Sequence, residues 1–166
     1  MPEIRTDQLL LPSVLDRLID HDPQVRKEAA QNRNQLLRDL KLAVRRDLEN
    51  LLNTRVRCVP WPAELKELKQ SLINYGIPDL TGASLGSSKE REEFRRTVQS
   101  VILTFEPRLK SPTVRLVDQT ETLDRSIRFH IDAVLQAEPA PEPVAFASTL
   151  RLATGSFEVK GDENGG

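Results

Sequence analysis

Apolar residues recur at helical spacing through the first two thirds of the chain. Over residues 34–52, leucines and a valine follow one another every three or four positions, which predicts one long amphipathic helix. A second long helix begins at a capping box formed by Ser87 and Glu90. We expect it to end near Phe105, because Pro107 keeps the residue before it out of the helical region.

Two shorter segments also have the pattern of amphipathic helices. Ser13 is a suitable N-cap for the first, and Gly76 is a suitable stop for the second, which we place over residues 62–75. In the second we expect one buried stripe, made of Leu65, Leu68 and Leu72. The first divides into an apolar side, Val14, Leu15, Leu18 and Ile19, and a polar side, Asp16, Arg17 and Asp20.

Beyond Phe105 the period of the pattern changes from 3.6 residues to two, which is typical of half-buried strands. Residues 127–132 alternate without a fault, and a return strand with Phe157 and Val159 can follow the turn at Gly155. Helices first and strands last predict an α+β fold, with N-terminal helices packed on a small antiparallel C-terminal sheet. The other predicted strands cover residues 112–118 and 144–152.

Composition narrows the class of protein. The chain has 166 residues, which is the size of one compact domain, and 30% of them are charged. We expect a flexible arm over 1–11, a single domain over 12–160 and a disordered tail over 161–166.

A net charge of -1 argues against nucleic-acid binding. No apolar run is long enough for membrane insertion, and a lone cysteine, Cys58, favours a reducing, cytoplasmic location.

Catalytic and metal-binding patterns are weak. The two histidines, His21 and His130, have no metal-ligand spacing, and Cys58 has no thiol neighbour, so we expect neither a metal nor a cofactor. A glycoside hydrolase needs a carboxyl group that stays protonated. Glu106 is the most conspicuous candidate, but Arg108 two residues further on favours its ionised form. An ion pair at a proline turn is the better interpretation.

Four segments, taken in order, resemble a known family. These are residues 12–18, 46–55, 71–79 and 105–109, the last of which contains the motif Glu106-Pro107-Arg108. Together they resemble the TssE subunits of type VI secretion baseplates, which are members of the lysozyme-related phage baseplate wedge family. The resemblance extends over most of residues 12–160.

The resemblance implies a non-enzymatic structural part of a contractile injection machine. Such a subunit contacts the wedge proteins TssF, TssG and TssK, and it offers a strand platform on which the TssB/TssC sheath begins to polymerise. The alternative function is a lysozyme-like hydrolase that cleaves peptidoglycan.

Two sets of residues are candidates for these contacts. Glu106 and Arg108, joined by Pro107, form either an internal brace or a partner contact, and Asp47, Glu49 and Arg55 either bind a partner or lie on a solvated helix face. For the sheath we expect docking on an edge strand within residues 144–152. In that strand Phe146, Leu150 and Leu152 point inward, and Thr149 and Arg151 point outward.

Overall fold

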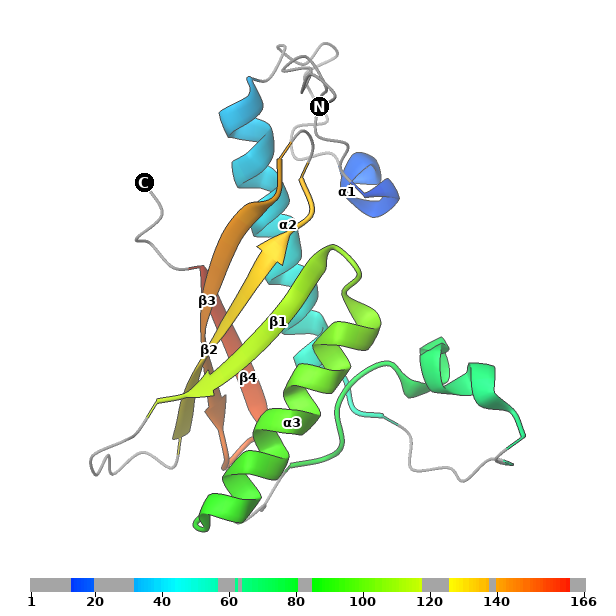
Figure 1. Cartoon of the computed structure of the whole chain (residues 1–166), viewed down its shortest axis with the longest axis vertical. Helices are drawn as coiled ribbons and strands as arrows, with labels where there is room; N and C mark the ends of the chain where they lie inside the picture. Colours follow the sequence, from blue (N-terminus) through cyan, green and yellow to red (C-terminus); the bar gives the residue numbers. More distant parts are fainter. Residues whose placement is uncertain are drawn as a thin grey trace.

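The computed structural model describes residues 13–19, 32–56, 62, 64–80, 85–117, 126–137 and 140–161. The expected arm, most of the expected tail, His21 and Cys58 lie outside these ranges. Helices come first and a four-stranded antiparallel sheet follows (Figure 1), so the predicted α+β class is confirmed. The elements are α1 (Val14–Leu18), α2 (Arg33–Asn53), the 3-10 helices η1 (Lys66–Gln70) and η2 (Leu72–Asn74), α3 (Ser88–Phe105), β1 (Leu109–Leu116), β2 (Ser126–Leu135), β3 (Glu142–Arg151) and β4 (Ser156–Gly161).

The two long helices begin and end close to where the sequence predicted. The Ser87 hydroxyl accepts from the backbone of Glu90, and the Glu90 carboxylate accepts from the backbone of Ser87, so the predicted capping box begins α3. Asn32 and Gln35 form a second such box at the start of α2. α3 ends at Phe105, as the following proline requires.

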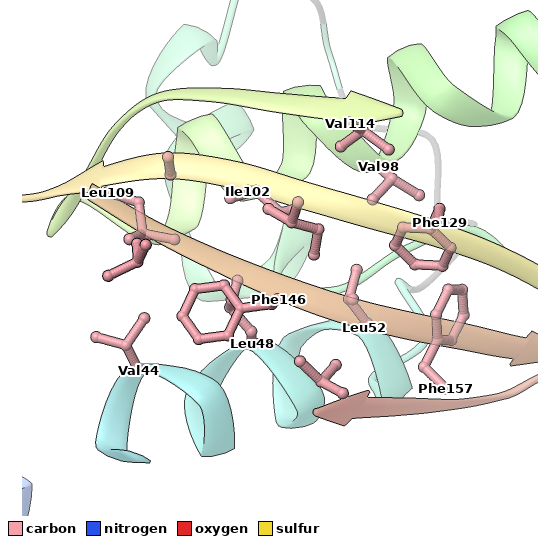
Figure 2. Close-up of a cluster of buried hydrophobic side chains, with 14 of the residues drawn as sticks. Val44, Leu48, Leu52, Val98, Ile102, Leu109, Val114, Phe129, Phe146 and Phe157 are labelled. Atoms are coloured by element: carbon pink, nitrogen blue, oxygen red, sulfur yellow. The ribbon is translucent and has the colours of Figure 1, made fainter. Parts of the chain in front are cut away.

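The core lies on one face of the sheet, beneath α2 and α3. On this face α2 packs against β4 and α3 packs against β1. Each long helix therefore covers one half of the same face. Figure 2 shows leucine and valine side chains of α2 meeting those of α3 and the inward phenylalanines of the strands. The rings of Phe94 on α3, Phe129 on β2 and Phe157 on β4 lie with centroids 5.7 to 6.5 Å apart. They tie α3 to β2 and to β4.

The segment over residues 62–75 is not the predicted α-helix. It forms two short 3-10 turns, and the leucines expected inside are partly or fully exposed, with Leu72 86% accessible. In an α-helix the Leu68 carbonyl would accept a hydrogen bond from a backbone N–H one turn later. Here it accepts from two side chains, Ser71 Oγ at 2.8 Å and Asn74 Nδ2 at 2.6 Å. Such local side-chain bonds compete with helical ones.

α1 also differs from its prediction, although Ser13 caps it as expected. Its apolar residues Val14 and Leu18 are exposed, and the residue that reaches the body of the protein is Asp16, from the predicted solvent side. The helix has only five residues, and the ion pair between Asp16 and Arg46 joins it to α2.

The strand expected to be a free edge is an interior strand. β3 pairs with β2 along one side and with β4 along the other, so Phe146, Thr149, Leu150 and Arg151 cannot receive a strand from outside. Leu152 lies in the turn that follows β3. The prediction failed because residues 156–161 form a full outer strand. That strand includes Gly161, which was expected to begin the tail.

β4 is an edge strand whose open side is largely occupied by side chains from α2. The Asn53 amide donates to the Phe157 carbonyl and accepts from the Phe157 N–H, both at 2.9 Å, as a neighbouring strand would. Arg45 donates to the Val159 carbonyl at 3.0 Å. Edge strands with unsatisfied backbone groups invite association, and α2 reduces that hazard here.

This arrangement predicts that Asn53→Ala destabilises the protein. The change leaves a backbone donor and an acceptor of Phe157 without their partner, at a cost of about 1–3 kcal/mol. Asn50→Ala, at an exposed position one turn earlier, is the matched control and should change stability little. Urea unfolding measures both. Equal midpoints for the two variants would show that the Asn53 amide does not support β4.

Candidate functional site

The candidate site is centred on a buried carboxylate at the point where α3 turns into β1. Glu106 is 5% exposed and is the residue that caps α3, with its backbone N–H bonded to the Ile102 carbonyl. The chain then reverses through Pro107, and the Leu109 N–H returns to the Glu106 carbonyl at 3.1 Å. The turn therefore points the Glu106 side chain inward, where an ionised group needs a cation.

Arg108 supplies that cation from two residues away. Its Nε and one terminal nitrogen bind the two Glu106 oxygens at 2.7 and 2.6 Å, which is the bidentate geometry that guanidinium favours. The same terminal nitrogen lies 2.6 Å from Asp47 Oδ2 on α2. The Arg108 carbonyl accepts from Gln136 N, beyond the end of β2, at 2.8 Å. One residue thus joins α2, the turn and the sheet.

The chain of charges continues from α2 to α1. Arg46 donates twice to Asp47 Oδ1, at 3.0 and 2.9 Å, and once to Asp16 Oδ1 at 2.7 Å. Glu106, Arg108, Asp47, Arg46 and Asp16 therefore alternate in sign along a continuous network, which we call the ion cluster. Its three carboxylates and two guanidiniums leave one net negative charge.

Within the ion cluster, hydrogen bonds favour the ionised forms of Arg108 and Asp16. The hydrogen bond to Glu106 raises the pKa of Arg108 well above its ordinary value, against the effect of burial. Burial alone would raise the pKa of Asp16, but hydrogen bonds from Ser13 and Arg46 outweigh it and lower that pKa. Burial, together with the nearby charges of Asp47 and Glu106, raises the pKa of the Tyr75 hydroxyl.

Two residues predicted for this site, Glu49 and Arg55, make contacts outside the ion cluster. Glu49 pairs with Arg45 at 3.4 Å, one helical turn away, on the side of α2 that faces β4. Arg55 donates to the carbonyls of Leu52 and Gly155 and so joins the end of α2 to the β3–β4 turn. Of the six predicted residues, the structure brings three into contact: Glu106, Arg108 and Asp47. Pro107 forms the turn between Glu106 and Arg108.

Sequence reasoning missed two members of the ion cluster. The pattern predicts Asp16 on the solvent side of α1, and Arg46 enters the sequence predictions only within the segment 46–55. Asp16 lies 30 residues from Arg46 in the chain, and no local spacing indicates that the two would meet. In the structure the same carboxylate also completes a capping box with Ser13.

A second feature is a groove of about 410 Å³ between the start of α3, the end of β1 and the start of β2. Leu85, Leu116 and Ile127 give it apolar walls, and Arg91 and Glu92 of α3 give it a charged rim. Glu92 is held by Arg95 and Arg96, which lower its pKa to about 2, whereas Arg91 contacts only the Gly86 carbonyl among the described residues.

The contacts of the ion cluster join separate elements of the fold. Both Glu106 oxygens and one Asp47 oxygen accept hydrogen bonds from Arg108, so both side chains are engaged within the protein. His130 lies on the polar face of β2, as predicted. Within the described ranges no three metal-ligating side chains gather, and no helix there is long and apolar enough to cross a bilayer.

The ion cluster predicts different effects for two arginines that make similar contacts. Arg108→Leu removes the cation from the buried Glu106 and should cost about 3–5 kcal/mol of unfolding free energy. Arg115→Leu is the control, because Arg115 also lies 2.6 Å from a carboxylate but is 68% exposed, and exposed pairs contribute about 0–1 kcal/mol. Chemical denaturation compares them. Similar losses would show that burial of the pair is energetically unimportant.

The anchoring of α1 should depend on pH. Because the pKa of Asp16 is lowered in the folded protein, its contribution is complete above its ordinary value of 3.8 and is lost as the pH falls through the lower value. NMR titration of the Asp16 carboxyl carbon measures this pKa, and Arg46→Gln should move it upward by removing a hydrogen bond. An unchanged titration in Arg46→Gln would mean that the pair does not hold α1.

Comparison with known proteins identifies the family. The family model described as baseplate wedge protein gp25 matches residues 38–140, which is more than half of the chain. No curated protein and no solved structure matches this chain significantly. The matched region contains most of α2, all of α3, β1 and β2, and the Glu106-Pro107-Arg108 turn. The chain therefore belongs to the gp25 family of baseplate wedge proteins, which are structural components of phage-tail-like baseplates.

Proposed function

We propose that this chain is a TssE-type subunit of a type VI secretion baseplate, which joins the wedge proteins and seeds the sheath by strand addition. The observation that carries the proposal is the difference between the two edges of the sheet. On β4, side chains of α2 occupy backbone groups of Phe157 and Val159. The open edge of β1 therefore replaces β3 as the place where a sheath strand is added.

The register of β1 identifies the backbone groups available there. The Val117 N–H donates to the Arg128 carbonyl across the β1–β2 ladder at 2.9 Å. In an antiparallel pair such residues alternate with residues whose backbone groups point away from the partner strand. Val114 and Leu116 therefore direct their N–H and C=O groups to the open edge, while their side chains stay on the core face.

Two further features support an added strand at this position. The groove beside Leu116 offers an apolar site for one side chain of the incoming segment, with the Arg91 guanidinium at its rim for an acidic neighbour. Near the start of β1, Pro112 and an irregular register between Lys110 and Thr113 interrupt the edge. Such irregularities limit unwanted pairing, and they confine addition to the second half of the strand.

The remaining parts of the proposal follow from family membership and from the sequence. Residues 12–161 act as one wedge-like domain without catalytic activity, in the cytoplasm. The wedge partners are TssF, TssG and TssK, and the sheath partners are TssB and TssC. The ion cluster acts as the brace that holds α1, α2 and the β1 edge in one orientation for these contacts.

A proline at position 116 tests the edge directly. Leu116→Pro removes an outward N–H that the sheet itself does not use, whereas Leu116→Ala shortens the same side chain and keeps the N–H. We expect both variants to co-purify with the wedge proteins, and only Leu116→Pro to lose sheath polymerisation, as seen by electron microscopy.

Thermal melting of both variants provides the control for folding. If a folded Leu116→Pro variant nucleates sheath as well as Leu116→Ala does, strand addition at β1 is wrong. If neither variant, nor the unmodified chain, co-purifies with wedge proteins, the assignment to this secretion system is wrong.

A further inference from the structure

The two faces of the sheet differ in what covers them. α2 and α3 pack on the core face, and among the described elements no helix lies over the opposite one, which we call the outer face. The register aligns the outer-face side chains in rows across the strands. One row contains Arg115, His130, Ala147 and Lys160, and the next contains Arg128, Thr149 and Glu158.

The outer face is basic, although the chain as a whole is slightly acidic. Antiparallel sheets commonly leave one polar face in water, so exposure alone does not indicate a partner. The charge of the outer face is a further observation. Five described cations face outward against two carboxylates, Asp132 and Glu158, while the net charge of the whole chain is -1. The cations are Lys110, Arg115, Arg128, Arg151 and Lys160.

Pairing within the outer face leaves positive charge uncompensated. Asp132 pairs with Arg115 at 2.6 Å, and Glu158 pairs with two cations of its own face, at 3.0 and 3.7 Å. Within the part of the chain that the structure describes, Lys110 and Arg128 have no carboxylate partner. The three paired cations are 66 to 70% exposed, and such pairs are weak because water screens them. An incoming segment therefore meets an excess of three accessible positive charges.

The side chains along the middle of the outer face are short. β3 lies between β2 and β4, and its outward residues there are Ala145, Ala147 and Thr149. Longer side chains stand on either side, among them Arg128 on β2 and Lys160 on β4. Because neighbouring strands lie about 4.8 Å apart, these two rows are about 10 Å apart, which is about the diameter of an α-helix. A helix laid along β3 therefore contacts the alanines beneath it and the cations on both flanks.

The mixture of charges favours a protein segment over a nucleic acid. Binding to a phosphate backbone relies on a clear basic excess, whereas this chain has a net charge of -1. A phosphate backbone would also meet Asp132 and Glu158 among the cations. The side chains of a protein helix can differ from position to position, so carboxylates lie beside the cations and neutral residues lie beside the two carboxylates.

We propose that the outer face docks an acidic amphipathic helix of a partner protein along β3. The helix directs apolar residues toward Ala145 and Ala147 and carries glutamates or aspartates on both flanks, toward Arg128 on one side and Lys160 on the other. The proposal requires neither sheath seeding nor strand addition at β1.

A designed acidic helix is the probe. It is a monomeric, lactam-bridged peptide with leucines on one face and glutamates on both flanks, titrated into the isotopically labelled full chain and followed by NMR. We expect saturable shift changes centred on residues 128–132 and 145–149. The dissociation constant should rise with salt concentration, because the contacts join exposed charges. A peptide with lysines in place of the glutamates should bind at least about tenfold more weakly.

Charge reversals make the test specific to the outer face. Arg128→Glu and Lys160→Glu, on opposite sides of β3, should each weaken binding of the acidic peptide by about tenfold or more. Arg38→Glu, at an exposed position of α2, changes the net charge of the chain equally and should leave the affinity within about twofold. Thermal melting of the three variants checks that each is folded.

Three results would overturn the proposal. The first is an absence of shift changes on the outer face, or equal weakening by Arg38→Glu and Arg128→Glu. The second is tighter binding of a DNA duplex than of the acidic peptide, which would assign the outer face to nucleic acid. The third is peptide binding that appears only after Asp118, Glu121 and Asp124 are changed to their amides, which would assign the outer face to that acidic segment of the chain itself.

Discussion

A carboxylate held out of water at the end of α3 constrains the rest of the structure. Glu106 cannot be buried as an anion without a cation, and Arg108 supplies it in bidentate form. Arg108 also binds Asp47 on α2, and Asp47 binds Arg46. Arg46 in turn binds Asp16 of α1. A buried ion pair is not in itself a strong source of stability, but it fixes which elements meet and in what orientation. The ion cluster does this for three helices and the first strand.

That orientation leaves the two edges of the sheet in different states. With α2 held along β4, Asn53 and Arg45 reach the outer backbone groups of β4. With α3 held over β1, the turn at Glu106 places β1 at the opposite edge, where a groove remains beside Leu116. The proposal that a strand is added at β1 rests on this difference between the two edges.

The sequence predicted the elements whose signals are local. The capping box at Ser87 and the proline after Glu106 set the bounds of α3, and strict alternation predicted β2, because one buried face is enough to produce these patterns. It failed where a local side-chain bond competes with the helix or where the deciding contact is distant in sequence. Residues 64–75 have leucines at helical spacing, but Ser71 and Asn74 bind the Leu68 carbonyl, and the position of β3 depends on a later strand. At the site, the pairing of Glu106 with Arg108 was predictable from their spacing. Asp16 was not.

The central claim is that the Glu106-Pro107-Arg108 turn is an internal brace whose reach extends to α2. A double-mutant cycle of Asp47→Asn and Arg108→Met, followed by denaturant unfolding, measures it most directly, because it isolates the coupling across the 2.6 Å contact. The brace predicts a coupling free energy of about 1–3 kcal/mol. A coupling free energy within about 0.3 kcal/mol of zero would contradict it. It would mean that the contact between the turn and α2 does not stabilise the fold.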